Sequence, residues 1–179
     1  QFLNLVGVGN QQLVNAGESR LDGAEIELSY YATENLVFTL GLGLLDTEFE
    51  DLTLNGDDLS GNELIEAPDI TANLAVDYTL PLSSAELAFH FDASYVGAQF
   101  FSPYNDAPPY DQATADAYWD LNGRIAFRPN GGRWQLALWG KNLGDNDEKT
   151  GAAVDLTTAT LFTTVPFPRR FGVELRVDF

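Results

Sequence analysis

The sequence predicts an all-β protein: an antiparallel transmembrane β-barrel segment of about seven to eight strands, with short periplasmic turns and long extracellular loops. Three observations predict this fold. Apolar and polar side chains alternate with a period of two along most of the chain. Short and long connections alternate between these segments. Aromatic residues gather near the ends of those segments, as they do at membrane interfaces.

Composition limits the class of protein. With 45% hydrophobic and 12% aromatic residues, the 179-residue chain is too apolar to be disordered despite its net charge of -18. It contains no apolar run of about eighteen residues, so a membrane-spanning structure would have to be built from strands. Nine Lys and Arg against 27 Asp and Glu argue against nucleic-acid binding, and the absence of cysteine excludes disulfides and thiolate chemistry.

The alternation begins clearly at residues 24–30, where Glu25 and Glu27 fall on the face opposite Ile26. It continues at residues 36–44, where large apolar residues alternate with small ones. Because successive side chains of a strand point to opposite faces, each segment is predicted to have one apolar and one polar face. Five further segments show the same pattern, at residues 70–79, 86–95, 119–128, 133–138 and 171–179. These make seven predicted strands, and an eighth is expected at residues 2–8.

The connections predict which ends of the strands lie together. Short turns rich in Gly, Pro, Asn and Ser are expected at residues 32–35, 81–84 and 129–132. Long loops are expected at residues 9–19, 50–67, 100–117 and 143–166. Tight periplasmic turns that alternate with longer extracellular loops are typical of outer-membrane barrels.

The aromatic residues near strand ends predict interfacial belts. They are Tyr30, Tyr31, Tyr78, Tyr95, Trp119, Phe127, Trp134 and Phe179. Because lipid offers no hydrogen bonds, only a closed sheet satisfies every strand, so we expect the apolar face to contact lipid and the charged face to line an aqueous lumen. The alternative is a soluble sandwich or lipocalin-like barrel, in which the apolar face would point to a dry core.

The last strand has the features of an assembly signal. Arg170, Gly172, Leu175, Val177 and the terminal Phe179 resemble the C-terminal signal that the outer-membrane barrel-assembly machinery reads. Recognition would be β-augmentation, in which an unpaired edge strand pairs with an edge of the machinery. The alternative is an ordinary last strand.

Three further stretches resemble the C-terminal barrel of TonB-dependent outer-membrane receptors. They are the G-x-E-x-E strand at residues 23–27, the G-x-x-L-x-x-A-P entry at residues 61–68 and the N-L-x-D element at residues 142–145. The resemblance covers nearly the whole chain. It implies that residues 1–179 are the C-terminal portion of such a receptor barrel, with the plug domain, the TonB box and the earlier strands absent.

The resemblance also implies a function. It is TonB-dependent uptake of a scarce nutrient, a ferric siderophore, cobalamin or an oligosaccharide, across the outer membrane of a Gram-negative bacterium. The implied partners are outer-membrane lipid, the barrel-assembly machinery, the nutrient or chelate, and TonB through the missing N-terminal region. Two alternatives stay open: a small stand-alone eight-stranded outer-membrane barrel with a structural or adhesive role, and a soluble β-barrel binding module.

Few residues are candidates for a site. Phe100, Phe101, Tyr104 and Tyr110 lie in one long loop and could stack on a sugar or an aromatic chelate, or could simply anchor the loop. His90, the single histidine, is expected to be a hydrogen-bonding residue of the polar face. No catalytic constellation, cofactor motif or ordered metal-ligand spacing is present, so we expect no enzyme activity, no cofactor and no metal.

Overall fold

The structure is a computed structural model that describes residues 2–5, 11–14, 17–155, 158 and 160–179. The described residues form strands, turns and loops, and no helix. None of them belongs to a helix long and apolar enough to cross a membrane.

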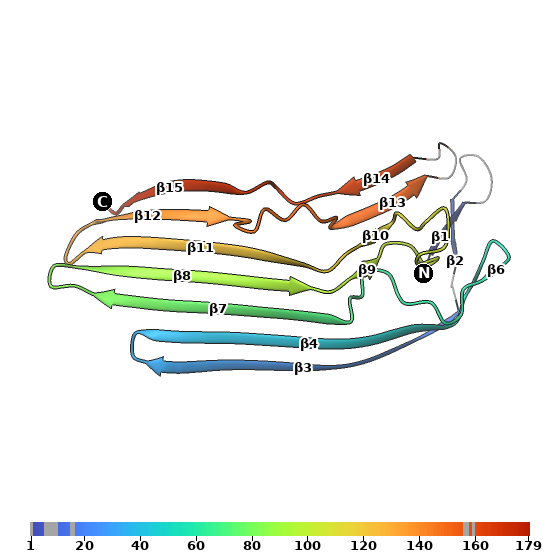
Figure 1. Cartoon of the computed structure of the whole chain (residues 1–179), viewed down its shortest axis with the longest axis horizontal. Helices are drawn as coiled ribbons and strands as arrows, with labels where there is room; N and C mark the ends of the chain where they lie inside the picture. Colours follow the sequence, from blue (N-terminus) through green and yellow to red (C-terminus); the bar gives the residue numbers. More distant parts are fainter. Residues whose placement is uncertain (1, 6–10, 15–16, 156–157, 159) are drawn as a thin grey trace.

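Seven long strands form one antiparallel sheet, which we call the wall (Figure 1). Its strands pair in the order β15-β12-β11-β8-β7-β4-β3, so each strand lies beside its neighbours in the chain. They are β3 (Glu18–Thr33), β4 (Leu36–Asp51), β7 (Ile70–Pro81), β8 (Ala85–Val96), β11 (Tyr118–Pro129), β12 (Trp134–Lys141) and β15 (Arg170–Val177). The seven predicted strands and the all-β antiparallel class are confirmed. The sheet is open, with β3 at one edge and β15 at the other.

The remaining strands form two-stranded ribbons apart from the wall. They are β1 (Phe2–Leu5) with β2 (Gln11–Val14), β5 (Thr53–Leu54) with β6 (Asp57–Asp58), β9 (Gln99–Phe100) with β10 (Thr114–Ala115), and β13 (Gly151–Asp155) with β14 (Thr160–Thr164). The eighth strand expected at residues 2–8 is therefore not part of the wall, because β1 pairs with β2 in a hairpin. Residues 6–8 of that prediction lie outside the described part.

The two ends of the wall differ as the sequence predicts. The three tight turns and the C-terminus lie at one end, which we call the turn end, and the long connections lie at the other, the loop end (Figure 1). The middle strands β7, β8 and β11 have 12 residues each. At about 3.3 Å per residue and a tilt near 45°, such strands cross about 28 Å, close to the thickness of a bilayer core.

Strand register gathers the apolar side chains on one face of the wall, the apolar face. One row crosses all seven strands, through Tyr30, Phe38, Val76, Phe91, Gly123, Gly140 and Phe171. The neighbouring row links Leu36, Tyr78, Phe89, Ile125, Leu138 and Val173. Because the side-chain period is two, a slip of one residue at any strand would break these rows.

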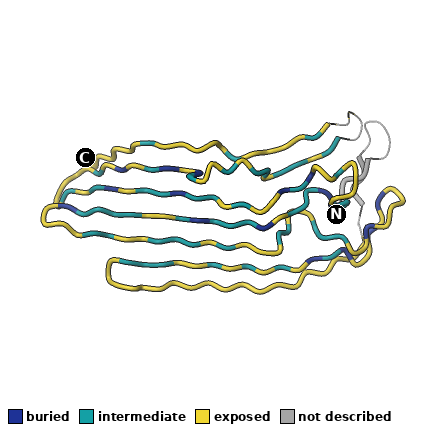
Figure 2. The backbone as a smooth tube through the Cα atoms, viewed as in Figure 1, coloured by how far each residue is buried: buried dark blue, intermediate teal, exposed yellow. Residues whose placement is uncertain are grey.

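The apolar face has no protein covering it. Ile26 is 62% exposed, Leu138 56% and Val173 67%. Figure 2 shows exposed and half-buried residues along the long strands, and the wall packs against no second layer. Apart from Phe49 near the loop end, the buried apolar residues of the described wall strands are alanines, so the apolar face has no cluster of large buried side chains. A sheet face of this kind is typical of strands that contact lipid.

Aromatic pairs mark both ends of the apolar face. Three cross-strand pairs lie toward the turn end, with ring centroids 5.7–6.4 Å apart: Tyr30 with Phe38, Tyr78 with Phe89, and Phe127 with Trp134. One pair, Tyr95 with Trp119, lies toward the loop end at 5.0 Å. This distribution fits two interfacial belts.

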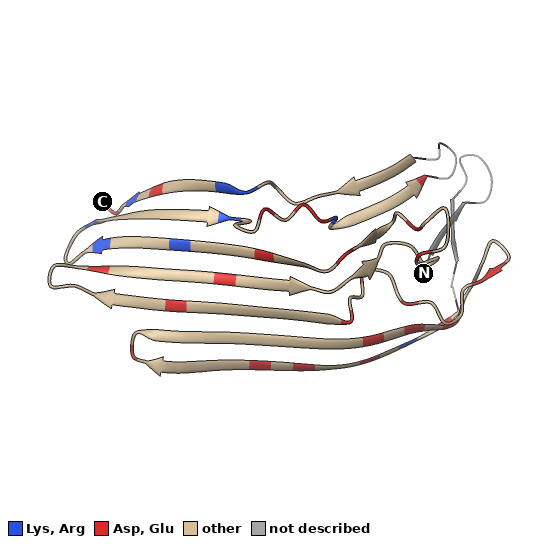
Figure 3. Ribbon diagram, in the orientation of Figure 1, with Lys and Arg blue, Asp and Glu red and all other residues tan. Residues whose placement is uncertain are grey.

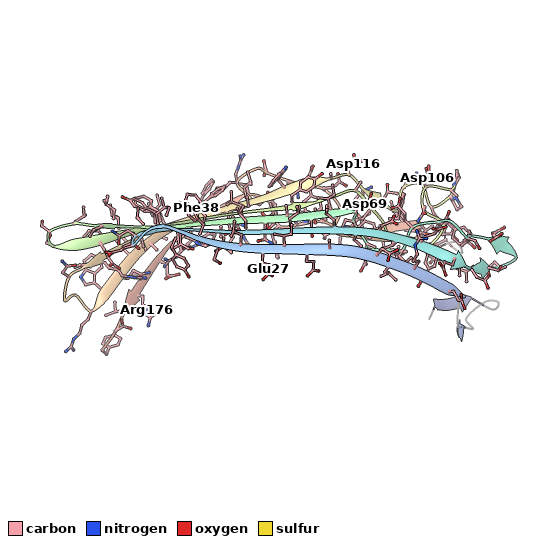
Figure 4. The ribbon with its side chains drawn as sticks, turned by 90° about the horizontal axis from the view of Figure 1, so that it is seen from below. Glu27, Phe38, Asp69, Asp106, Asp116 and Arg176 are labelled. Carbon is pink, nitrogen blue, oxygen red and sulfur yellow. The ribbon has the colours of Figure 1, made fainter. Side chains whose placement is uncertain are left out.

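The opposite, polar face carries the charged side chains. Figure 4 shows that the wall is twisted and bowed. Glu27 projects from the underside of the wall, and the end of the wall that carries Arg176 bends toward the same side. Glu27 lies in register with Gly41, which lies opposite Asn73. The polar residues thus lie on the hollow side of the wall, where the lumen of a closed barrel would be.

A close contact on the polar face explains one glycine of the last strand. Gly172 pairs with Trp139, and a Cβ atom added at Gly172 would lie 2.2 Å from the Trp139 indole ring. The indole therefore lies across the bare backbone of Gly172. This packing requirement is separate from the assembly-signal pattern in which Gly172 was predicted to act.

We expect the Gly172→Ala substitution to destabilise the barrel by about 1 to 3 kcal/mol, because the added methyl group overpacks the Trp139 contact. The measurement is the temperature at which the full-length protein loses its compact, folded band in SDS gels. In a Trp139→Ala background the same substitution should cost little. Gly151→Ala is the matched control, since a Cβ there meets only Thr164 at an ordinary 3.7 Å. Equal losses for Gly172→Ala in both backgrounds would contradict the explanation.

Candidate functional site

A chain of polar contacts crosses the middle of the polar face. His90 Nδ1 lies 2.8 Å from Asp77 Oδ1, and its Nε2 lies 3.4 Å from Asp92 Oδ1. Asn122 donates a 2.7 Å hydrogen bond to Asp92, and the Asn142 backbone N–H donates to Asn122 at 3.1 Å. Three strands, β7, β8 and β11, are thus linked through side chains as well as through their backbone, and the residue that follows β12 joins them through its backbone N–H.

Ion pairs offset part of the acidic charge on this face. Arg124 contacts Glu174 at 3.0 Å, and Arg128 contacts Glu86 at 2.8 Å while donating to Gln135 at 2.6 Å. Figure 3 shows acidic residues on most strands and basic residues mainly on β11, β12 and β15. These groups are about one-third or more exposed, so each pair contributes little to stability alone. Their arrangement fits the solvated interior of a barrel.

His90 has the hydrogen-bonding surroundings that the sequence indicated. Its two ring nitrogens face carboxylates on either side. Within the described residues no group of three His, Cys, Asp or Glu side chains is placed to hold a metal ion.

The N-L-x-D element forms a buried corner where β12 leaves the wall. The Asn142 amide donates to the backbone carbonyls of Asn146 at 2.7 Å and Phe167 at 3.1 Å, and its Oδ1 accepts from the Asn146 N–H at 2.7 Å. Asp145 binds Arg169 through an ion pair at 3.2 Å. Asn142 adopts a positive φ of 50°, which asparagine tolerates better than most residues. The motif therefore ties both ends of the loop 142–169 together.

A small hydrophobic core lies in the loops beyond the wall. Phe49, at the loop end of β4, packs with Leu52, Leu54 and Leu59, all less than 10% exposed. Tyr104 from the next long loop packs against this cluster. The wall itself has no comparable cluster among the described residues, so these loops are the part of the structure that resembles a folded globular core.

Backbone and amide contacts join the loops 52–69 and 97–117. Asn105 is 7% exposed, and its side chain bonds both the N–H and the carbonyl of Glu63, at 2.9 and 3.0 Å. Asn62 donates to the Pro103 carbonyl at 2.8 Å. Two loops that are separate in the sequence are therefore held as one unit.

The four aromatic residues predicted to contact a ligand all lie in the loop 97–117, but they form two separate groups. Tyr104 and Tyr110 stack with ring centroids 4.4 Å apart and an interplanar angle of 8°. Phe100 belongs to β9, and its carbonyl accepts from the Glu66 N–H at 2.8 Å. The N–H of Phe101 donates to Ala113 within the same loop. All four side chains are half-buried, so they anchor the loop and also present ring surface to solvent.

Burial, neighbouring charges and hydrogen bonds shift the pKa values of three side chains in these loops. Burial, with the negative charges of Asp69 and Asp46, raises the pKa of Glu63. Burial and the neighbouring Tyr104 raise the pKa of Tyr110. Hydrogen bonds from the Ser60 hydroxyl and backbone lower the pKa of Asp58. Tyr110 therefore keeps its phenolic proton at neutral pH and can donate a hydrogen bond.

Sequence reasoning missed the residues that join the loops. Asn62, Asn105 and the Phe49 cluster have no periodic pattern of their own, because their partners come from other loops. The only feature of the local sequence that pointed to these contacts was the high content of Asp and Asn in the loops.

The predicted assembly-signal residues lie on an edge strand. β15 pairs only with β12 among the described strands. Leu175 and Val177 are exposed on the apolar face, and Phe179 is fully exposed beyond the end of the strand. Arg170 and Gly172 lie on the polar face, opposite Lys141 and Trp139.

Comparison with known proteins gives one family and one fold. Residues 1–143 match the family described as "TonB dependent receptor-like, beta-barrel". The chain superposes on the ferric yersiniabactin uptake receptor FyuA from Yersinia pestis with a TM-score of 0.77 and 19% identity, over 92% of this chain and 24% of that one. For the siderophore receptor PiuA from Acinetobacter baumannii the TM-score is 0.70 at 22% identity, over 89% and 22%. For the ferric citrate transporter FecA it is 0.71 at 19%, over 96% and 26%. The chain spans about a quarter of the length of these structures.

Replacing Asn142 with alanine should loosen the loop 142–169, because it removes the amide hydrogen bonds to the backbone of Asn146 and Phe167, at about 0.5 to 1.5 kcal/mol for each bond. The measurement is the rate of proteolytic cleavage within residues 143–169 of the full-length protein. Asn142→Gly, which suits the positive φ, should show most of the same increase. Asn130→Ala, which loses one exposed 3.5 Å contact, is the control. An unchanged cleavage rate in Asn142→Gly would contradict the role of the amide.

Proposed function

Since this chain belongs to the TonB-dependent receptor β-barrel family, we propose that it is the C-terminal part of an outer-membrane receptor that imports a ferric siderophore or a similar scarce chelate. Receptors of this family are transporters and not enzymes, and they bind siderophore-type small molecules and interact with TonB. Their characterised barrels lie in the outer membrane of Gram-negative bacteria. We propose the same location here.

One observation supports this proposal most: the wall is an open, two-faced sheet with an uncovered apolar side. Both edge strands, β3 and β15, have one partner each among the described strands. In lipid, such edges would leave backbone N–H and C=O groups unpaired at a cost of several kcal/mol for each group. The remaining strands of a larger barrel would pair with both edges. This favours a receptor wall over a small barrel of seven or eight strands.

The loop end is the proposed substrate entrance. Its two joined loops present the stacked Tyr104 and Tyr110 on a preorganised core. Preorganised aromatic surfaces bind planar or cyclic ligands with little loss of entropy. The solved structures with this fold include receptors named for ferric yersiniabactin and ferric citrate uptake, which supports an iron chelate as the ligand class. Energy would come from TonB, through a region that precedes these residues in the full receptor.

The last strand is the proposed assembly signal. Arg170, Gly172, Leu175, Val177 and Phe179 lie on an edge that has no partner on its outer side among the described residues. Such an edge can pair with the edge strand of the barrel-assembly machinery. The fully exposed Phe179 ring would then be free to contact the machinery.

We expect iron-limited Gram-negative cells that carry the full receptor as their sole siderophore receptor to accumulate radioactive iron from a ferric siderophore, and to lose this uptake when TonB is removed. In these cells Tyr110→Ala should weaken siderophore binding roughly two- to tenfold, because it removes one ring of the stacked pair. Tyr31→Ala, a tyrosine 73% exposed near the turn end, is the matched control. Uptake that persists without TonB would overturn the proposed function.

Replacing Phe179 with alanine should lower the amount of folded receptor in the outer membrane severalfold, since the terminal ring is part of the proposed signal. The measurement is the ratio of folded to unfolded receptor in isolated outer membranes. Phe162→Ala is the matched control, because Phe162 is an aromatic residue of β14 that is 60% exposed at the loop end. Equal folded fractions for the two variants would refute a role of Phe179 in assembly.

A further inference from the structure

The side chain of Asn105 pairs with a peptide group of another loop. Its Oδ1 accepts a 2.9 Å hydrogen bond from the N–H of Glu63, and its Nδ2 donates a 3.0 Å bond to the carbonyl of the same residue. The Nδ2 atom also lies 3.4 Å from the Ser102 carbonyl. Glu63 is 42 positions earlier in the chain. The amide thus satisfies both backbone groups of Glu63, as the opposite residue of an antiparallel strand would.

The backbone at Asn105 is shaped for this contact. Asn105 adopts a positive φ of 53°, which asparagine tolerates better than most residues. The residue is only 7% exposed, and a buried side-chain amide needs hydrogen-bond partners. Asparagine meets both requirements here, whereas glycine would meet only the first.

Tyr104, the residue before Asn105, is the first ring of the stacked pair. The Tyr104 side chain packs against the Phe49 cluster. The hydroxyl group of this ring lies 3.4 Å from the Leu54 carbonyl and 3.4 Å from the Asn55 amide. Both contacts are long for hydrogen bonds. The shorter bonds that hold this point of the chain on the neighbouring loop are therefore those of the Asn105 side chain.

The second ring depends on the same point of the chain. The Ala107 N–H donates to the Tyr104 carbonyl at 3.1 Å, and the Tyr110 N–H donates to the Ala107 carbonyl at 2.8 Å. These two consecutive turns bring the Tyr110 ring onto the Tyr104 ring, with the ring centroids 4.4 Å apart. The short strands β9 and β10 pair on either side of these turns, at the loop end (Figure 1). A shift of the chain at Asn105 would therefore displace both rings.

We propose that Asn105 is a positioning residue for the ligand of this receptor. Its buried amide holds the loop 97–117 on the loop 52–69 and so fixes the Tyr104 and Tyr110 rings before a ligand arrives. This inference rests on the proposed receptor function and on the role given there to the two rings. Rings that are already fixed lose little conformational freedom on binding, so the affinity depends on a residue that the ligand does not touch.

The first test measures hydrogen–deuterium exchange of the purified full-length protein without ligand. Asn105→Gly suits the positive φ and removes the amide. Exchange of the Glu63 N–H and of residues 99–110 should become about tenfold faster or more, because the bonds that join the two loops are lost. Asn130→Gly, which loses one exposed 3.5 Å contact at the turn end, is the matched control and should leave this exchange unchanged. Unchanged exchange in Asn105→Gly would overturn the proposal.

The second test measures the Kd of three iron probes for the full-length protein: ferric citrate, a ferric tris-catecholate and a ferric trihydroxamate. For the probe that the wild type binds most tightly, Asn105→Gly should raise the Kd about three- to tenfold. In a Tyr110→Ala background, where the ring pair is already lost, the same substitution should change the Kd by less than about twofold. Asn130→Gly should leave the Kd unchanged.

The remaining outcomes separate this inference from the proposed function. Faster exchange with an unchanged Kd would make Asn105 a purely structural residue and refute the positioning role. An equal rise of the Kd in both backgrounds would mean that Asn105 does not act through the two rings, which also refutes it. In both cases the receptor function stands, because the wild type binds an iron probe. Binding of no probe would refute this inference, and together with no TonB-dependent iron uptake it would also refute the receptor function.

Discussion

The hydrogen-bonding demand of the backbone in lipid is the constraint on which the other features of this structure depend. A strand in hydrocarbon must pair along its whole length on both sides, so the wall consists of consecutive antiparallel neighbours with no crossover. The same demand fixes register, because each strand must also keep its apolar row on the lipid side. The row from Tyr30 to Phe171 satisfies both requirements across seven strands.

The sequence predicts the wall well because period-two alternation is a local signal. Five of the seven strands were expected within three residues of their actual ends, and the turn end was expected from its turn-forming residues. The main difference is length: β3 and β4 have 16 residues each, since they continue beyond the apolar band as far as Glu18 and Asp51. The extension could not be predicted from the sequence, because apolar and polar residues no longer alternate where both faces of a strand contact water and carry charged residues.

The loop structure could not be predicted in the same way, because its contacts join residues that are far apart in the sequence. Asn105 and Glu63 are 42 positions apart, and the loop core needs Phe49 from a strand and Tyr104 from a later loop. No period or motif encodes such pairs. Gly172 shows a related limit: the sequence pattern indicated an assembly role, but only the structure reveals that the Trp139 ring needs the missing side chain.

The two faces of the wall meet different physical requirements. On the apolar face, almost any large hydrophobic residue satisfies lipid, so the chain is free to vary there. On the polar face, water already solvates isolated charges, so pairing is not required for stability. Arg124, Arg128 and Arg176 are nevertheless each paired with a carboxylate, so these pairs order the side chains of the polar face while adding little to the stability of the fold.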